Sequence, residues 1–192
     1  MIVSAKLRIA AVSVSVTALF ALAGCGGSDP LEPTAKAETP VPKKAADVSV
    51  DVPEAAKAHS AAGGVEFTKF YFDQVNASFA SGEYLPLVKL TSSSCIVCRQ
   101  TIGDIAFAWA RGSIQGGKFT LKDVKSVKET EDLNSLSFAY DEDAYTELDA
   151  KGGTVWKAEA KKDLPTVVQV KWIGDGWQMS QLAPNTKVKD EK

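Results

Sequence analysis

The sequence predicts an α+β domain in which two or three helices cover one face of an antiparallel sheet of five or six strands. Apolar residues recur at helical spacing between positions 65 and 112, and from Lys118 onward they alternate with a period of two. All the helical segments therefore precede the strands. That order is typical of α+β domains, in which helices gather on one side of the sheet.

The first helix is expected from Val65 to Gly82, where the glycine ends it. Its apolar residues occupy more than half of the helix circumference, so the helix is expected to be packed on two sides. These residues are Val65, Phe67, Phe70, Tyr71, Phe72, Val75 and Phe79.

A short turn or helix at 83–92 leads to another helix, with Ser94 as its expected N-cap and Gly112 as its end. One face of this helix is expected to be buried, because its members recur at steps of four, three and four. They are Cys98, Ile102, Ile105 and Trp109.

The strands begin at 118–128, where Phe119 and Leu121 alternate in one phase and Val124 in the other, which predicts a β-bulge. Gly152-Gly153 predicts the turn of a hairpin. The remaining strands are expected at 135–140, 144–150, 154–160, 166–172 and 177–182.

The chain is expected to have four parts. Residues 1–24 read as an export signal, because a basic start precedes an apolar run that is too short to span a membrane. Residues 25–62 contain five of the eight prolines and no aromatic residue, which predicts a disordered tether. The folded domain is expected at 63–184, followed by a charged tail at 185–192.

The export signal ends in Leu22-Ala23-Gly24-Cys25, which resembles the lipobox of bacterial lipoproteins. The resemblance implies cleavage before Cys25 and attachment of a diacylglyceryl group to its sulfur, with palmitate as a further acyl chain. Two chains would anchor the protein stably to the cell membrane, facing outside the cytoplasm. The alternative is an ordinary secretory signal with an accidental cysteine.

The charge balance disfavours nucleic acid as a partner. The chain has 22 basic and 24 acidic residues, and removal of the signal with Lys6 and Arg8 leaves 20 against 24. A mildly acidic chain offers no electrostatic attraction to a phosphate backbone. The expected partners are the membrane, through the lipid at Cys25, and either an unknown envelope protein or a small apolar ligand.

Cys95 and Cys98 are expected to form a disulfide, because exported thiols tend to oxidise and Cys25 is lost to lipid. In a helical turn their Cα atoms would lie roughly 5 Å apart, and closing so short a loop contributes about 1.9 kcal/mol. A catalytic dithiol of the thioredoxin type is the alternative. No aromatic residue precedes Cys95, however, and the segment upstream is helical. A zinc site would lack two ligands, since the only histidine, His59, falls in the expected tether.

The order of elements resembles the cone fold of ketosteroid isomerase, the polyketide-cyclase-like proteins and nuclear transport factor two. Residues 53–98, "PEAAKAHSAAGGVEFTKFYFDQVNASFASGEYLPLVKLTSSSCIVC", together with "DGW" at 175–177, resemble an uncharacterised family of actinobacterial lipoproteins. The resemblance implies a strongly curved sheet with a pocket between it and the helices. It implies no activity.

Six residues are candidates for lining such a pocket, although the tryptophans among them are first of all expected core residues. They are Tyr71, Asn76, Trp109, Tyr140, Trp172 and Trp177. The acidic run at 141–149 predicts a solvated turn and strand face, since Thr146 stands where an EF-hand loop needs glycine.

No catalytic residue, metal or cofactor is expected. The predicted domain contains no histidine for a nucleophile-histidine pair, and no carboxylate stands in a recognisable motif. The expected function is therefore a non-catalytic binding or interaction module of the cell envelope. Two alternatives are a thiol–disulfide oxidoreductase using Cys95 and Cys98, and a small-molecule isomerase or cyclase using the pocket.

Overall fold

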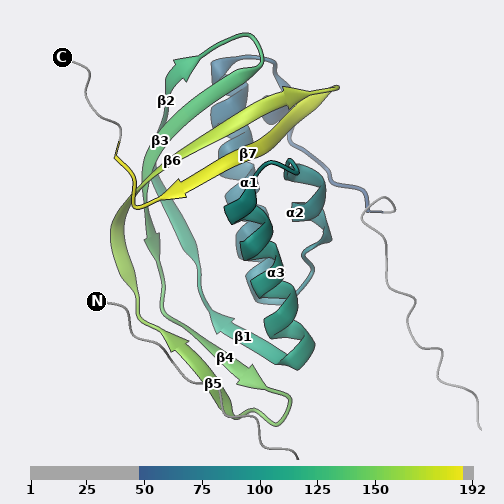
Figure 1. The fold of residues 1–192 in the computed structure, drawn as a ribbon, viewed down its shortest axis with the longest axis vertical. Helices are drawn as coiled ribbons and strands as arrows, with labels where there is room; N and C mark the ends of the chain where they lie inside the picture. The colour runs from purple at the N-terminus through teal and green to yellow at the C-terminus, as the bar shows by residue number, and fades with distance from the viewer. Residues whose placement is uncertain (1–47, 188–192) are drawn as a thin grey trace, which may run out of the picture. The chain divides into compact units, whose positions relative to one another are not determined.

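The long aromatic helix α1 (Ala61–Ser81) lies against a curved antiparallel sheet and organises the fold (Figure 1). The computed structural model describes residues 48–187. Ser60 caps the helix by accepting a hydrogen bond from the Gly63 N–H at 3.2 Å. Gly82 ends it in the left-handed conformation with φ of 76°, as the sequence predicts.

Two more helices, α2 (Leu85–Leu90) and α3 (Ile96–Arg111), confirm the predicted helical segments. The N-cap of α3 is Cys95, so the prediction of Ser94 is wrong. The Cys95 sulfur accepts a hydrogen bond from the Cys98 N–H at 3.3 Å. Ser94 instead donates its hydroxyl hydrogen to the Ser180 carbonyl, also at 3.3 Å, and so links the start of the helix to the sheet.

Seven strands form two antiparallel sheets, which confirms the α+β class. One sheet has the order β2-β3-β6-β7 and the other β1-β4-β5. The strands are β1 (Gly112–Gly116), β2 (Phe119–Glu129), β3 (Leu133–Glu142), β4 (Tyr145–Asp149), β5 (Thr154–Ala158), β6 (Lys161–Ile173) and β7 (Gly176–Pro184).

Six of these strands fall at predicted positions, and β1 was not predicted. The predicted bulge in β2 is confirmed, because its pairing with β3 slips between Lys122 and Lys125. Asp123 occupies this bulge with φ of 53°. In Figure 1 the sheets curve around the helices, which lie on one side of them.

The core lies between α1, the other helices and the concave face of the larger sheet. Leu136, Val168, Val170 and Met179 are fully buried on the sheet, and they face the buried helical residues Phe67, Leu87 and Ile105. Each such side chain contributes about 1.5–3 kcal/mol by leaving water. Five members of the predicted aromatic stripe on α1 are buried, while Val65 and Phe70 are only partly buried.

Residues 48–60 belong to the folded domain, so the predicted tether boundary at residue 62 is wrong. A 3₁₀ turn at Glu54–Lys57 buries Ala56 to 1% exposure. The Ala58 carbonyl accepts a hydrogen bond from the Trp177 indole at 2.9 Å. The aromatic partners come from β6 and β7, which explains why the composition of the segment itself did not reveal its packing.

All the described residues fall within one compact unit, Val41–Lys192. The predicted export signal, Cys25 and the last residues of the charged tail lie outside the described range. Within that range, no helix combines the length and the apolar character needed to cross a bilayer.

Candidate functional site

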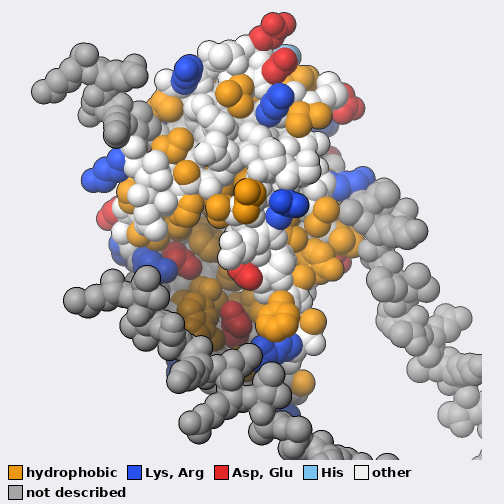
Figure 2. Space-filling view, viewed as in Figure 1, with side chains coloured by type: hydrophobic (Ala, Val, Ile, Leu, Met, Phe, Trp, Pro, Cys, Tyr) orange, Lys and Arg blue, Asp and Glu red, His pale blue; other side chains and the backbone are white. Residues whose placement is uncertain are grey.

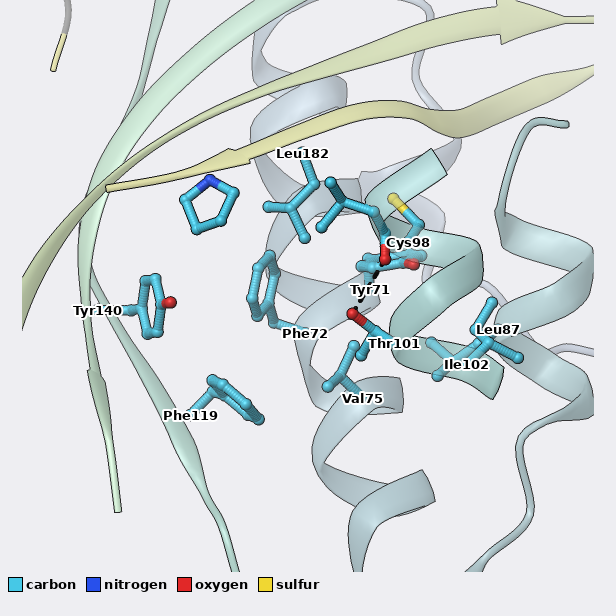
Figure 3. A pocket seen from close by; sticks show the side chains of 12 residues that line it. Tyr71, Phe72, Val75, Leu87, Cys98, Thr101, Ile102, Phe119, Tyr140 and Leu182 are labelled. Carbon is cyan, nitrogen blue, oxygen red and sulfur yellow. Dashed lines mark hydrogen bonds between the residues drawn. The ribbon is translucent and has the colours of Figure 1, made fainter. Parts of the chain in front are cut away.

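An apolar cavity of about 130 Å³ lies between the helices and the sheet (Figure 3). From α1 it is lined by Phe72 and Val75, and from the sheet by Phe119, Tyr140, Leu182 and Pro184. Seen from the same side as in Figure 1, the surface is hollowed below β6 and β7, and both hydrophobic and acidic side chains are recessed there (Figure 2).

Helix α3 closes the cavity with Cys98, Thr101 and Ile102. These positions follow one another at steps of three and one, so they share one face of the helix. The disulfide at the start of α3 therefore forms part of the cavity wall. The helix is held at this end by the bond from Ser94 to β7 and at the other by Trp109, whose indole donates to the Phe79 carbonyl at 3.2 Å.

Two tyrosines bring hydroxyl groups to the cavity, and they differ in how these groups are used. The Tyr71 hydroxyl lies 3.0 Å from the hydroxyl of Thr91, with which it shares a hydrogen bond. Burial raises the pKa of Tyr71 to about 12, although the bond to Thr91 acts in the opposite direction. Among residues 48–187 no hydrogen bond is formed by the Tyr140 hydroxyl, which is not one of their buried side-chain atoms left without a partner. Its pKa is also raised, first by burial and then by the nearby carboxylate of Glu142.

The described lining of this cavity is apolar apart from a few hydroxyl groups. None of the described residues that line the cavity is acidic or a histidine. Both tyrosines stay neutral near pH 7, because their pKa values are raised. The Thr101 hydroxyl donates a hydrogen bond to the Val97 carbonyl at 3.1 Å. A general base must lie within hydrogen-bond reach of the proton that it removes. The residues therefore offer apolar contact and a small number of neutral hydroxyls.

The structure places two of the six candidate pocket residues, Tyr71 and Tyr140, in the wall of this cavity. Asn76 instead joins α1 to β2, donating to the Phe119 carbonyl at 2.9 Å and accepting from its N–H at 2.8 Å. Trp172 and Trp177 pack on each other and on His59, with ring centroids 5.3 Å apart between the two indoles.

Trp109 lies outside the cavity as well, because its ring packs on Gly82. A Cβ atom added to Gly82 would approach that ring to 2.7 Å, so the glycine is needed both for its left-handed φ and for this contact. The cavity is also lined by Phe119, Leu182 and Pro184, which were not among the residues predicted from the sequence. Leu182 and Pro184 come from the end of β7, where no periodicity marks them.

The predicted disulfide between Cys95 and Cys98 is confirmed, and the Cα atoms are 5.3 Å apart. Each cysteine is only 1% exposed. Thiol–disulfide exchange requires direct attack on a sulfur, and this burial leaves an attacking thiolate little access. The segment that precedes the pair is helix α2, where the thioredoxin interpretation needs a strand.

The acidic run at 141–149 forms ion pairs on the surface of the sheets. Asp141 accepts a hydrogen bond from Lys122 at 2.6 Å and contacts Lys162 at 3.4 Å. The bond from Lys122 and a backbone N–H bond from Asp163 lower the pKa of Asp141 to about 2. Asp149 accepts bonds from two backbone N–H groups of the β4–β5 turn. These contacts confirm a turn and strand face, but the predicted solvation does not hold for Asp141 and Glu142, whose side chains are only 16% and 12% exposed.

Comparison with solved structures finds domains of similar arrangement. An NTF2-like protein of unknown function from Rhodospirillum rubrum is 11% identical, covers 62% of this chain and 98% of its own, and has a TM-score of 0.42. A putative dehydratase of the NTF2-like family from Streptomyces avermitilis is 13% identical, with 65% and 97% covered and a TM-score of 0.43. The intermembrane space region of the chloroplast protein ARC6 is 11% identical, with 66% and 97% covered and a TM-score of 0.48.

No curated protein matches the chain. A family model does match, and it spans residues 38–183. This range includes residues 48–60, in agreement with their packing on the domain. The chain therefore belongs to DUF6318, a family of unknown function.

Proposed function

We propose that this chain is a lipid-anchored protein of the actinobacterial cell envelope whose domain binds a small apolar ligand without altering it chemically. The observation that carries the proposal is the cavity between α1, α3 and the sheet, with apolar walls, neutral hydroxyls and no acidic or histidine side chain among its described lining. Ligand sites commonly combine such apolar walls with a few polar groups that fix orientation.

The size of the cavity limits the ligand. A volume of about 130 Å³ is close to that of an engineered cavity of about 150 Å³ that admits benzene. Drug-sized ligands need roughly 300–1,000 Å³. The ligand is therefore a single ring or a short branched chain, or one such part of a longer molecule whose remainder extends into the hollow.

The affinity for a single ring follows from its buried area. Burial of about 200 Å² at about 25 cal/mol per Å² gives about 5 kcal/mol, a dissociation constant of about 0.2 mM. The loss of translational freedom weakens this value, so a free ring should bind in the millimolar range. A physiological ligand would gain further affinity from groups outside the cavity.

Two features support the location in the envelope. The sequence Leu22–Cys25 resembles a lipobox, and the disulfide between Cys95 and Cys98 suits an oxidising compartment. Replacing Cys25 with Ala should move the protein out of the detergent-soluble membrane fraction. An unchanged partition into detergent would remove the lipid anchor from the proposal.

The ligand-binding proposal is tested by titrating the 41–192 unit with toluene and following methyl signals by NMR. Val75→Phe fills the cavity and should abolish the shifts. Leu182→Phe serves the same purpose at the partly exposed end of β7, should Val75→Phe fail to fold. The matched control is Val155→Phe, because Val155 lies on β5 at 44% exposure and does not line the cavity. Equal binding by Val75→Phe and the unaltered unit, or no binding by any form, would overturn the proposal.

A further inference from the structure

A half-exposed tryptophan and a tyrosine form an aromatic corner on the smaller sheet, β1-β4-β5. Trp156 on β5 is 49% exposed, and its ring centroid lies 5.2 Å from that of Tyr145 on β4, with the two ring planes inclined by 60°. Neither residue lines the cavity of the proposed function. We propose that this corner is a second binding site, which takes an organic cation of the quaternary ammonium type between the ring faces and the carboxylates beside them.

The register of the smaller sheet places a carboxylate at the aromatic corner. Glu147 is the direct partner of Trp156 in the β4–β5 pair, and side chains directly opposite each other in an antiparallel pair lie on the same face. Tyr145 precedes Glu147 by two residues in the same strand, so it shares this face. The face is turned toward the interior, because Ile114, the partner of Glu147 on β1, is only 6% exposed. The corner therefore lies where the inner face of the sheet meets solvent.

The charge at the aromatic corner is negative. Burial first, and then the carboxylates of Glu142, Glu147 and Asp104, raise the pKa of Tyr145 to about 12, so three acidic groups act on this ring. Glu142 is paired with Lys161 at 3.2 Å, whereas neither Asp104 nor Glu147 forms an ion pair within residues 48–187. Figure 2 shows acidic side chains recessed with hydrophobic ones in the hollow between β7 and the smaller sheet. A cationic ligand would supply the counter-charge.

The two rings favour an organic cation over a metal ion. The face of an aromatic ring attracts a cation through the quadrupole of the ring, most strongly for tryptophan, and recognition of quaternary ammonium groups is a frequent use of this attraction. Among residues 48–187 the side-chain cation that lies over an aromatic ring is that of Arg111, 5.0 Å from the centroid of Phe107, so Tyr145 and Trp156 have no such partner there. Within the same range, no group of three or more His, Cys, Asp or Glu side chains is placed to hold a metal ion.

The test compares choline with dimethylbutanol, its neutral analogue in which a carbon atom replaces the charged nitrogen. Each is titrated into the 41–192 unit, and the backbone amide signals of β4 and β5 are followed by NMR. Choline should bind more tightly than the alcohol, and its affinity should fall as salt is added, because salt screens exposed carboxylates. Equal binding of the two compounds, or no choline-dependent shift in β4 and β5, would overturn the proposal.

Two variants remove the proposed contacts one at a time. Trp156→Leu keeps an apolar side chain but removes a ring face, so it should weaken choline binding about twofold to fivefold, as expected for one exposed cation–π contact. Glu147→Gln should weaken the binding of choline and leave that of the alcohol unchanged. The matched controls are Phe107→Leu, which removes another exposed ring, and Glu129→Gln, which removes another exposed carboxylate. Equal effects in the variants and their controls would place choline elsewhere on the chain and overturn the site.

Vesicles of phosphatidylcholine separate two sources of the ammonium group. They present it at a membrane surface, and flotation measures whether the 41–192 unit associates with them. Flotation that free choline abolishes would assign a lipid headgroup, whereas choline binding without flotation would assign a soluble cation, and either result supports the site. If toluene enters the cavity but choline does not bind, the cation site is overturned and the proposed function stands.

Discussion

His59 stacks face to face on Trp172, with ring centroids 4.3 Å apart and ring planes inclined by 13°. Trp177 meets the same imidazole edge-on at 5.7 Å, and the His59 Nε2 atom lies 2.6 Å from the Glu131 carbonyl oxygen. Residues that precede α1 are thereby attached to the β6–β7 hairpin. The single histidine of the chain therefore joins the segment before α1 to strands β6 and β7, which come much later in the sequence.

Replacing His59 with Ala should lower the free energy of unfolding by about 1 kcal/mol, because a stacked aromatic pair is worth about 0.5–1.5 kcal/mol beyond its buried area. It should also speed tryptic cleavage after Lys57, which is measured on the folded unit. His59→Phe keeps the stacking and should retain most of the stability. Unchanged stability and unchanged cleavage in His59→Ala would show that the segment is not held by this contact.

Asn76 gives a second test, since its amide satisfies both backbone groups of Phe119 at 2.8 and 2.9 Å. Asn76→Ala leaves these groups without partners at the start of β2 and should cost about 2–3 kcal/mol in urea unfolding. Asn76→Asp keeps the acceptor for the N–H but turns a carboxylate oxygen toward the Phe119 carbonyl oxygen, so it should cost at least as much. Unchanged stability in either variant would contradict the assigned bonds.

The disulfide should stabilise the fold and should not act as a redox catalyst. Changing Cys95 and Cys98 together to Ala should cost about 2 kcal/mol from loop closure, plus a contribution from packing, while the fold is retained. The unaltered unit should not reduce insulin in the presence of dithiothreitol, because both sulfurs are buried. Insulin reduction that disappears in the double variant would establish the oxidoreductase alternative.

Asp141 makes stability depend on pH in the acid range. The pKa of Asp141 is lowered to about 2, first by the hydrogen bond from Lys122. The ionised side chain therefore makes its full contribution to the free energy of unfolding when the pH is above 3.8, the ordinary pKa of the group. The contribution is lost as the pH falls from about 4 through 2. The difference in unfolding free energy between the unaltered unit and Asp141→Asn should therefore narrow over this interval. Lys122→Met should remove most of this dependence of stability on pH. If the difference in unfolding free energy between the unaltered unit and Asp141→Asn stays constant with pH, the ion pair is excluded.

Much of the fold could be predicted from the sequence, because its strongest patterns are local. The aromatic stripe of α1 and the alternation of the strands each fix which face is buried. Strand β1 escaped prediction because Gly112–Gly116 is too short to show alternation and carries glycine at both ends. Its pairing with β4 is a tertiary contact, and no local pattern reports it.

The errors in the site and in the domain boundary have a similar cause. Ala58 and His59 find their partners on β6 and β7, more than a hundred residues away, so the composition of their own segment indicated disorder. Tyr71 and Tyr140 were identified as cavity residues from residue type and expected fold. Trp172 and Trp177 share that residue type, but they pack at the turn that joins β6 to β7.

The most direct measurement is a crystal structure of the 41–192 unit grown with saturating toluene. The proposed function predicts electron density for one ring enclosed by Phe72, Phe119 and Leu182, and no such density in crystals of Val75→Phe. A cavity that stays unoccupied at saturating toluene, or that is closed by its own side chains, would contradict the claim that this domain binds a small apolar ligand.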